Sequence, residues 1–214
     1  HVTDNNIINS IVIESAFKNK IKHLIMLSCT LMYKSSSKLI KERDLNLNNK
    51  IYSKYFGGAW MKVYMEKMSE FFSNISKTKF TIIRHSNIYG QFDLNKSHVF
   101  GASITKVMNS KKFVKILGKG NEKRDLLYID DLTNFIHNVI LKQKKKFRIY
   151  NCGRGEFLSV NSLVSKIVKI SQKKLKIRNI KSYNSLNTYV KLDCSLARKE
   201  LGWKPKVSLD KGIK

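Results

Sequence analysis

Short apolar runs alternate along this chain with longer segments in which apolar residues recur at helical spacing. The runs at residues 22–28, 79–84 and 148–153 are bounded by polar residues and are too short for helices, so they predict buried strands. Because helical segments lie between these runs, the sequence predicts an α/β fold with a mainly parallel sheet. We expect helices at residues 6–20, 60–75, 99–109, 132–140, 159–170 and 195–202.

The segments between these elements carry further local signals. Residues 34–53 are polar and predict a loop, and the tetrapeptide NIYG at residues 87–90 predicts a turn. Residues 113–131 predict two short strands that flank a glycine-containing turn. Either Asp130 or Asp131 can cap the helix that follows, because aspartate is a favoured N-cap residue.

The position of the glycines limits which α/β fold the chain can form, because the first glycine of the chain is Gly57. A doubly wound nucleotide-binding domain carries its phosphate-binding turn after the first strand, as a glycine-rich loop that opens a helix. No such turn occurs before Gly57. Two expectations stay open on this ground: another kind of α/β fold, or the C-terminal part of a longer protein.

The formal net charge of +27 raises the question of a nucleic-acid partner. Of the 42 basic residues only seven are arginines, and the lysines are spread over the whole chain. Arginine is the residue suited to gripping phosphates, so we expect a solvated, lysine-rich surface and no specific nucleic-acid partner. A basic nucleic-acid-binding protein remains the less favoured alternative, because that interpretation depends on charge alone.

The cysteines, histidines and apolar stretches limit the environment and the chemistry. Cys29, Cys152 and Cys194 are odd in number and too far apart for a disulfide framework, which favours a reducing cytoplasm. No apolar stretch approaches the ~20 residues of a membrane-spanning helix. The five histidines show no ligand spacing with acids or thiols, so we expect no metal site.

Five stretches, in this order and spacing, together resemble the extended short-chain dehydrogenase/reductase family of NAD-dependent nucleotide-sugar epimerases and dehydratases. They are LSCTLMY (27–33), FGGAWMKVYMEKMSEFF (56–72), IIRHSNIYGQFD (82–93), LGKGNEKRDLLYIDDL (117–132) and LDCSLARKELGWKPKVSLDKGI (192–213). The resemblance covers essentially the whole chain. A sixth stretch, KSHVFGASITKVM (96–108), is similar to the branch that contains GDP-fucose synthase.

The resemblance implies a Rossmann-type doubly wound parallel sheet with a smaller α/β substrate-binding domain. Residues 1–89 and 126–153 would be the C-terminal part of the NAD-binding domain, and residues 90–125 and 154–214 would form the substrate-binding domain. The N-terminal strands of the sheet, with their GxxGxxG turn, would be missing. On this expectation the chain is a C-terminal fragment that could hardly hold NAD by itself.

In this family a hydride passes between a sugar carbon and the nicotinamide, while a tyrosine four residues before a lysine moves the hydroxyl proton. The lysine cation lowers the pKa of the tyrosine, and its ammonium group binds the nicotinamide ribose. The resemblance assigns Lys62 to the lysine position, but Gly58 stands at the tyrosine position. This departure puts the usual proton relay in question.

The resemblance also implies a serine or threonine that hydrogen-bonds the sugar oxygen. Cys29 stands at this position, with Thr30 beside it, and a thiol is a weaker donor that can ionise. Tyr55, three residues before Gly58, can supply a phenol in place of the missing tyrosine if the intervening turn folds over the site. The alternative is that Tyr55 is a packed aromatic side chain.

Five further residues match family positions that contact the cofactor or the substrate. The backbone at His85 and Ser86 would lie along the nicotinamide, and Asn87 would contact the substrate. His98 would bind the substrate and act as an acid in epimerisation. The guanidinium of Arg124 would hold the diphosphate of a sugar nucleotide through two hydrogen bonds.

Each of three substrate-site residues has a plainer alternative. Asn87 can be a turn-forming residue, and His98 can be a surface histidine at the start of a helix. Arg124 can form an ion pair with Asp125 or Asp130.

The sequence therefore predicts an epimerase, dehydratase or epimerase-reductase that uses NAD or NADP and acts on a nucleotide-activated sugar. The alternative is a family member that binds a sugar nucleotide without redox turnover. The resemblance also implies a homodimer held by a four-helix bundle, with residues 60–75 as one of its helices. The Met and Phe residues of that helix fit a core position equally well.

Overall fold

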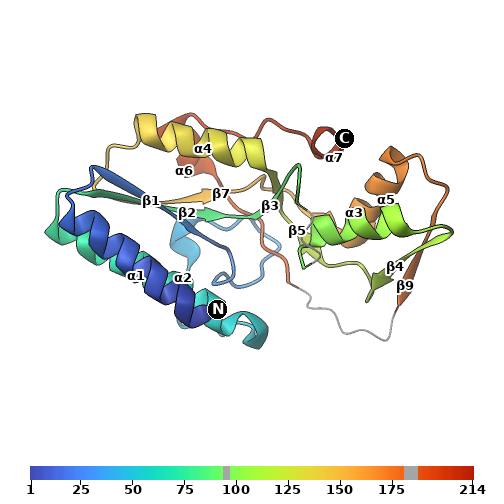
Figure 1. Cartoon of the computed structure of the whole chain (residues 1–214), viewed down its shortest axis with the longest axis horizontal. Helices are drawn as coiled ribbons and strands as arrows, with labels where there is room; N and C mark the ends of the chain where they lie inside the picture. Colours follow the sequence, from blue (N-terminus) through green and yellow to red (C-terminus); the bar gives the residue numbers. More distant parts are fainter. Residues whose placement is uncertain (94–96, 181–187) are drawn as a thin grey trace.

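A three-stranded parallel sheet lies at the centre of the structure (Figure 1). The computed structural model of the protein describes residues 1–93, 97–180 and 188–214. The sheet consists of β1 (His23–Ser28), β2 (Lys79–His85) and β7 (Phe147–Cys152), in the order β1-β2-β7. Ser28 aligns with Arg84, and Arg84 aligns with Asn151, so the carboxyl ends of all three strands lie at one edge.

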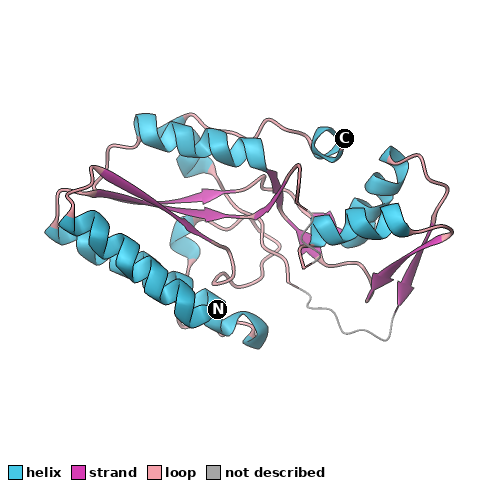
Figure 2. Ribbon diagram, in the orientation of Figure 1, coloured by secondary structure: helices cyan, strands magenta, loops and turns pink. Residues whose placement is uncertain are grey.

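Helices cover both faces of this sheet (Figure 2). On one face lie α1 (Val2–Lys18) and α2 (Phe56–Ile75), which pack against each other. On the other face lie α4 (Ile129–Lys142) and the shorter α6 (Ser195–Leu201). A parallel sheet between two helical layers is a doubly wound α/β arrangement, so the predicted fold class is confirmed.

The sequence of β2 explains why both faces of the sheet are covered. Successive residues of a strand point to opposite faces, and each face of β2 carries apolar side chains. Phe80 and Ile82 pack in one buried cluster with Met65 of α2. Ile83 packs in a second cluster with Phe135 of α4, so each face of β2 is buried against its own helical layer.

A second, smaller group of elements lies beside the carboxyl edge of the sheet (Figure 1). It contains α3 (Val99–Asn109), α5 (Val160–Ile170) and the parallel pair β4 (Phe113–Leu117) and β9 (Lys176–Ile180). The two helices pack on each other and on the strand pair around a separate apolar cluster. That cluster includes Phe100, Val107, Val114, Ile116, Leu163 and Ile167.

Short strands connect the two groups. Strand β3 (Asn87–Tyr89) pairs in parallel with β6 (Leu126–Tyr128), and β5 (Lys123–Arg124) pairs antiparallel with β8 (Leu158–Ser159). The remaining elements are the 3-10 helices η1 (Glu42–Asp44) and η2 (Ser53–Tyr55), the C-terminal α7 (Leu209–Ile213) and a bridge between Ile40 and Leu192.

The predicted strands and helices are confirmed within a few residues, with two main differences at helix starts. Helix α1 begins at Val2, and α2 begins at Phe56, so Gly57 and Gly58 lie inside the first turn of α2. Ser159 caps α5, and Gly202 ends α6 in a left-handed conformation with φ of 64°, as the turn chemistry predicts.

Three local predictions are wrong. Residues 87–90 do not form a turn, because the main-chain amide of Asn87 donates to the Asp125 carbonyl and starts a strand pair. Residues 113–131 contain three short strands and not two. Neither Asp130 nor Asp131 caps α4, whose N-cap residue is Tyr128. The buried carboxylate of Asp131 instead accepts hydrogen bonds from the main-chain amides of Lys206 and Val207.

Two further findings concern residues 1–93, 97–180 and 188–214. No helix there is long and apolar enough to cross a membrane. No three histidine, cysteine, aspartate or glutamate side chains in these ranges come together as ligands for a metal ion. The domain boundaries expected from the sequence stay a prediction, and residues 94–96 and 181–187 of the expected substrate-binding domain lie outside the described part.

Candidate active site

A cleft of about 460 Å³ opens at the carboxyl ends of β1 and β2, between the sheet and α3. Open α/β sheets bind their ligands at this edge. Every site residue predicted from the sequence lines this cleft except Lys62, although the residues come from segments far apart in the chain. They are Cys29, Thr30, Tyr55, His85, Ser86, Asn87, His98 and Arg124.

Lys62 lies beside the cleft, one helical turn after Gly58 on α2. Its Nζ donates a hydrogen bond to the main-chain oxygen of Leu27, at 2.8 Å, near the end of β1. Burial lowers the pKa of His85, whose Nδ1 lies 2.8 Å from the Ser86 carbonyl, and the Lys62 cation lowers that pKa further. The positive charge of Lys62 therefore affects His85 in the cleft wall.

Cys29 is half-buried in the wall of the cleft. Burial raises the pKa of the Cys29 thiol, and the negative charge of Glu66 also raises it, while Lys62 and Arg84 act in the opposite direction. The thiol is therefore protonated at neutral pH and can donate only a weak hydrogen bond. The adjacent Thr30 hydroxyl is the stronger donor, and this residue lines the cleft as well.

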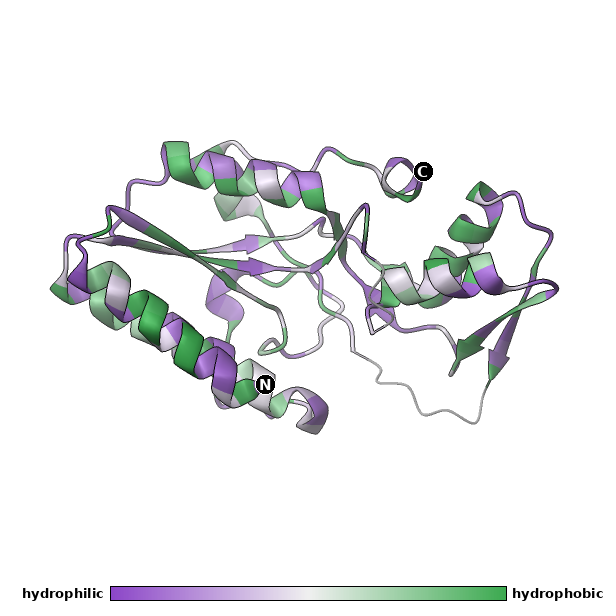
Figure 3. Cartoon of the chain, in the orientation of Figure 1, coloured by the Kyte–Doolittle hydropathy of each residue, from purple (hydrophilic) through white to green (hydrophobic). Residues whose placement is uncertain are grey.

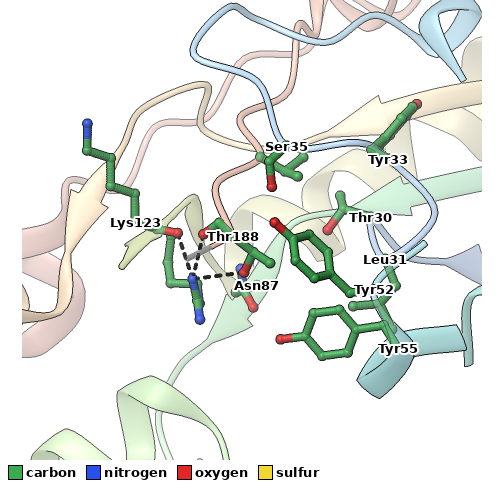
Figure 4. A pocket seen from close by; sticks show the side chains of 11 residues that line it. Thr30, Leu31, Tyr33, Ser35, Tyr52, Tyr55, Asn87, Lys123 and Thr188 are labelled. Carbon is green, nitrogen blue, oxygen red and sulfur yellow. Dashed lines mark hydrogen bonds between the residues drawn. The ribbon is translucent and has the colours of Figure 1, made fainter. Parts of the chain in front are cut away.

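A smaller cavity of about 70 Å³ adjoins the cleft and shares Thr30, Tyr55, Asn87 and Arg124 with it. Two tyrosines enter it from the segment before α2, and Figure 4 shows Tyr52 and Tyr55 extending toward Asn87 and Thr188. Tyr55 is the N-cap residue of α2, so its half-buried ring faces the cavities and is not enclosed in the core.

Sequence reasoning missed seven residues of this cavity, which are Leu31, Tyr33, Ser35, Tyr52, Lys123, Thr188 and Val190. Tyr52 has a local signal, the tetrapeptide YSKY, which places two tyrosines three residues apart directly before a helix. Ser35, Lys123 and Thr188 have none, because long-range contacts bring them to the cavity.

Arg124 lines both cavities, and its Nη1 donates to the carbonyl oxygens of Lys123 and Thr188, both at 2.9 Å. The alternative of an ion pair with Asp125 or Asp130 is wrong, because Arg124 forms no ion pair with either of these described residues. Within the described part of the chain, Nε and Nη2 have no hydrogen-bond partner. The guanidinium therefore keeps donors for an anion.

Asp125, the next residue, points inward and is fully buried. Its carboxylate accepts hydrogen bonds from the main-chain amides of Arg154, Gly155 and Leu192, at 2.8, 2.9 and 3.2 Å. Gly153 is a glycine for this reason, since a Cβ there would lie 2.8 Å from the Asp125 carboxylate. Three distant segments are thus joined directly behind the cleft.

Asn87 and His98 each combine a structural position with a place in the cleft wall. The amide of Asn87 donates to the Asp125 carbonyl at 3.3 Å, while the residue itself stays exposed to both cavities. His98 is the N-cap residue of α3, and its Nδ1 lies 3.5 Å from the Asp93 carboxylate. Both side chains face the space in which a substrate would lie.

Comparison with known proteins agrees with this geometry. Residues 2–153 match the NAD dependent epimerase/dehydratase family. The chain belongs to this family. The predicted family is thereby confirmed, and so is its NAD dependence, whereas the choice between NAD and NADP stays a prediction.

Relatives in the NAD-dependent epimerase/dehydratase family match nearly the whole chain. GDP-L-colitose synthase of Yersinia pseudotuberculosis is 28% identical over 94% of this chain and 68% of its own length. GDP-L-fucose synthase of Sinorhizobium fredii is 28% identical over 99% of this chain and 69% of its own length.

A solved structure shows the same fold. UDP-glucuronic acid 4-epimerase from Bacillus cereus, in complex with UDP-glucuronic acid and NAD, has a TM-score of 0.84 and is 25% identical over 100% of this chain. The match covers 66% of that epimerase, so the chain spans about two thirds of the length of the family members compared.

The residues present fit the nicotinamide end of the family's cofactor. Position 58 carries no side chain, and a Cβ there would contact only Leu31, at 3.5 Å, so the wall beside Lys62 is open. Lys62 offers a cation and hydrogen-bond donor, and the main chain at His85 and Ser86 lies in the facing wall. These three residues are the ones that would hold the nicotinamide and its ribose.

Proposed function

We propose that the protein is an NAD- or NADP-dependent epimerase, dehydratase or epimerase-reductase that acts on a nucleotide-activated sugar. The observation that carries this proposal is the cleft at the carboxyl edge of the sheet. It gathers a tyrosine, a threonine, two histidines and an arginine next to the Lys62 cation. Family membership and the sugar-nucleotide enzymes among the relatives support the same conclusion.

The cofactor, when bound, supplies the hydride acceptor and donor. The chain supplies the proton transfer, and we assign this role to the Tyr55 phenol. The phenolate form of Tyr55 would accept the proton of a sugar hydroxyl and become a neutral phenol as the hydride leaves the sugar carbon. A cation such as Lys62 stabilises the phenolate before it accepts the proton. Thr30, with Cys29 beside it in the cleft lining, would hold the sugar oxygen.

The outer part of the cleft would bind the rest of the substrate. The Nε and Nη2 donors of Arg124, which have no partner among the described residues, suit the diphosphate, because a guanidinium can hold two phosphate oxygens at once. Asn87 would contact the sugar. His98, beside Asp93, would donate a proton during epimerisation at a neighbouring carbon.

A second candidate function is binding of a sugar nucleotide without redox turnover. The observation that favours it is Gly58, since the family resemblance places the proton-relay tyrosine there. Incubation of the natural protein with NAD and a panel of UDP- and GDP-sugars distinguishes the two. We expect a new sugar epimer in the proton NMR spectrum; tight calorimetric binding with an unchanged spectrum would instead establish the second function.

We further propose that the protein is a cytoplasmic homodimer that pairs through α1 and α2. Large apolar side chains of both helices are exposed, and Figure 3 shows hydrophobic bands along them. On α2 these side chains recur on one face, and Tyr64 and Phe71 are 47% and 54% exposed. A Phe71→Glu variant should sediment as a monomer, whereas Phe92→Glu, which changes an exposed side chain outside these helices, should leave the dimer intact.

A further inference from the structure

Two polar contacts, one helical turn apart, attach α2 to the end of β1. Lys62 Nζ donates to the Leu27 carbonyl at 2.8 Å, and the Ser28 hydroxyl donates to Glu66 Oε1 at 2.6 Å. Leu27 and Ser28 directly precede Cys29 of the cleft wall. One cation and one anion of the same helix therefore hold the last two residues of the strand.

Glu66 is also paired with Arg84 of β2. Arg84 Nε donates to Oε1 at 3.0 Å and Nη2 donates to Oε2 at 2.6 Å, and the two side chains are only 4% and 5% exposed. A two-bond pair of this kind fixes orientation as well as distance. Because Arg84 precedes His85, the same ion pair fixes α2 relative to the strand that carries the facing wall of the cleft.

Arg84 extends this attachment to the turn after β1. Its Nη1 donates to the Tyr33 hydroxyl at 2.9 Å, and that hydroxyl donates to Asn151 Oδ1 of β7 at 2.8 Å. Burial raises the pKa of Tyr33 to about 12, so the phenol stays a donor at neutral pH. The segment from Cys29 to Tyr33 is thus held at both ends, at Ser28 and at Tyr33.

We propose that the Glu66–Arg84 ion pair is the positioning element of this site. It sets the Lys62 ammonium and the Cys29–Thr30 segment in their places along the cleft, and neither of its members lines a cavity itself. The inference builds on the proposed function, in which Lys62 and Thr30 face the cofactor and the sugar. It adds Glu66 and Arg84, which contribute to the site only by positioning Lys62 and Thr30.

The chain contains a matched control for this proposal. Arg148 and Glu200 also form a two-bond ion pair, and the Tyr150 hydroxyl donates to the same carboxylate at 2.7 Å. This pair joins β7 to α6 and lines neither the cleft nor the adjoining cavity. Loss of either pair lowers stability, but only loss of the first should disturb Lys62.

The test compares Glu66→Gln and Arg84→Lys with Glu200→Gln in the full chain, without ligand. The readout is the rate at which an acylating reagent modifies Lys62, measured by peptide mass spectrometry. We expect this rate to rise about fivefold in the first two variants, because the lysine is released from its strand contact, and to stay within about twofold of wild type in Glu200→Gln. Arg84→Lys keeps a positive charge and serves if Glu66→Gln does not fold.

Equal Lys62 acylation rates in all three variants would overturn the proposal, since the ion pair would then be merely structural. The second readout is the affinity for NAD, measured by calorimetry on the natural protein and on the same two substitutions made in it. We expect this affinity to fall about tenfold in Glu66→Gln and to remain unchanged in Glu200→Gln. If the natural protein without substitutions binds no NAD, the proposed function fails, whereas the Lys62 acylation rates still decide the positioning role.

Discussion

Gly58 lies one helical turn before Lys62 on α2, and a Cβ atom at Gly58 would come no closer than 3.5 Å to its nearest neighbour, Leu31. Position 58 therefore has room for a side chain, whose Cβ would lie against Leu31 of the cleft lining. Position 57 has less room for a side chain, because a Cβ at Gly57 would lie 3.2 Å from the Val2 side chain.

We first predict that Gly58→Ala stabilises the protein by about 0.5–1 kcal/mol, because alanine restricts the unfolded chain and suits a helix. Gly57→Ala should stabilise it by less, since Val2 must move. Urea unfolding of both variants measures the difference. An equal or larger gain from Gly57→Ala would contradict the geometry at these two positions.

The second prediction concerns the phenol that replaces the missing tyrosine. Tyr55→Phe should lower kcat about 10²-fold or more and leave sugar-nucleotide affinity nearly unchanged, because it removes only the proton-transferring hydroxyl. Tyr52→Phe is the matched control and should retain most of the activity. Adding Gly58→Tyr to the Tyr55→Phe variant should restore turnover, since it places a phenol one turn before Lys62. Full activity in Tyr55→Phe would rule this role out.

The third prediction concerns the substrate diphosphate. Arg124→Lys should weaken sugar-nucleotide binding about tenfold, because an ammonium group cannot bind two phosphate oxygens with the same fixed geometry. Affinity for NAD should not change. Arg178→Lys, in which the altered cation lies over Phe113 in the smaller group of elements, is the control and should bind the substrate as wild type does. Calorimetry with each ligand separates these outcomes.

The fourth prediction concerns pH. Burial lowers the pKa of both His23 and His85 below the ordinary value of 6.5, and the neighbouring cations Lys79 and Lys62 lower it further. In the window below 6.5 the unfolded chain binds protons that the folded chain does not. Stability should therefore be complete above that pH and fall on acidification, by at most about 1.4 kcal/mol per pH unit for each histidine.

Urea midpoints at about pH 7.5 and about pH 5.5 measure this loss. His23→Gln should lessen it, because the side chain that bonds the Thr81 hydroxyl no longer titrates. His137→Gln, at an exposed position of α4, should leave the loss unchanged. A loss that His23→Gln does not lessen would assign the acid sensitivity to other groups.

The sequence predicted the elements of this fold because their signals are local. Apolar runs and helical spacing predicted β1, β2, β7 and the main helices, and residues from several of the family-like motifs line one cleft in the structure. Residues 87–90 were misread because a strand of three residues is defined by its partner β6 and not by its own sequence.

The parts that sequence reasoning missed depend on contacts between distant residues. Arg124 and Thr188 are 64 positions apart, and Tyr33 and Asn151 are 118 apart. The Glu66–Arg84 pair joins a helix to a strand that follows it, and nothing in either segment indicates that both charges are buried. Periodicity cannot supply such pairings, because it carries no information on which elements meet.

The inward carboxylate of Asp125 has a consequence for how this protein can evolve. Its partners are main-chain amides, which every residue except proline provides, so the fixed position of Arg124 does not depend on the neighbouring side chains. A frame built in this way tolerates changes in the side chains around it, except at Gly153, where a Cβ would lie 2.8 Å from the Asp125 carboxylate.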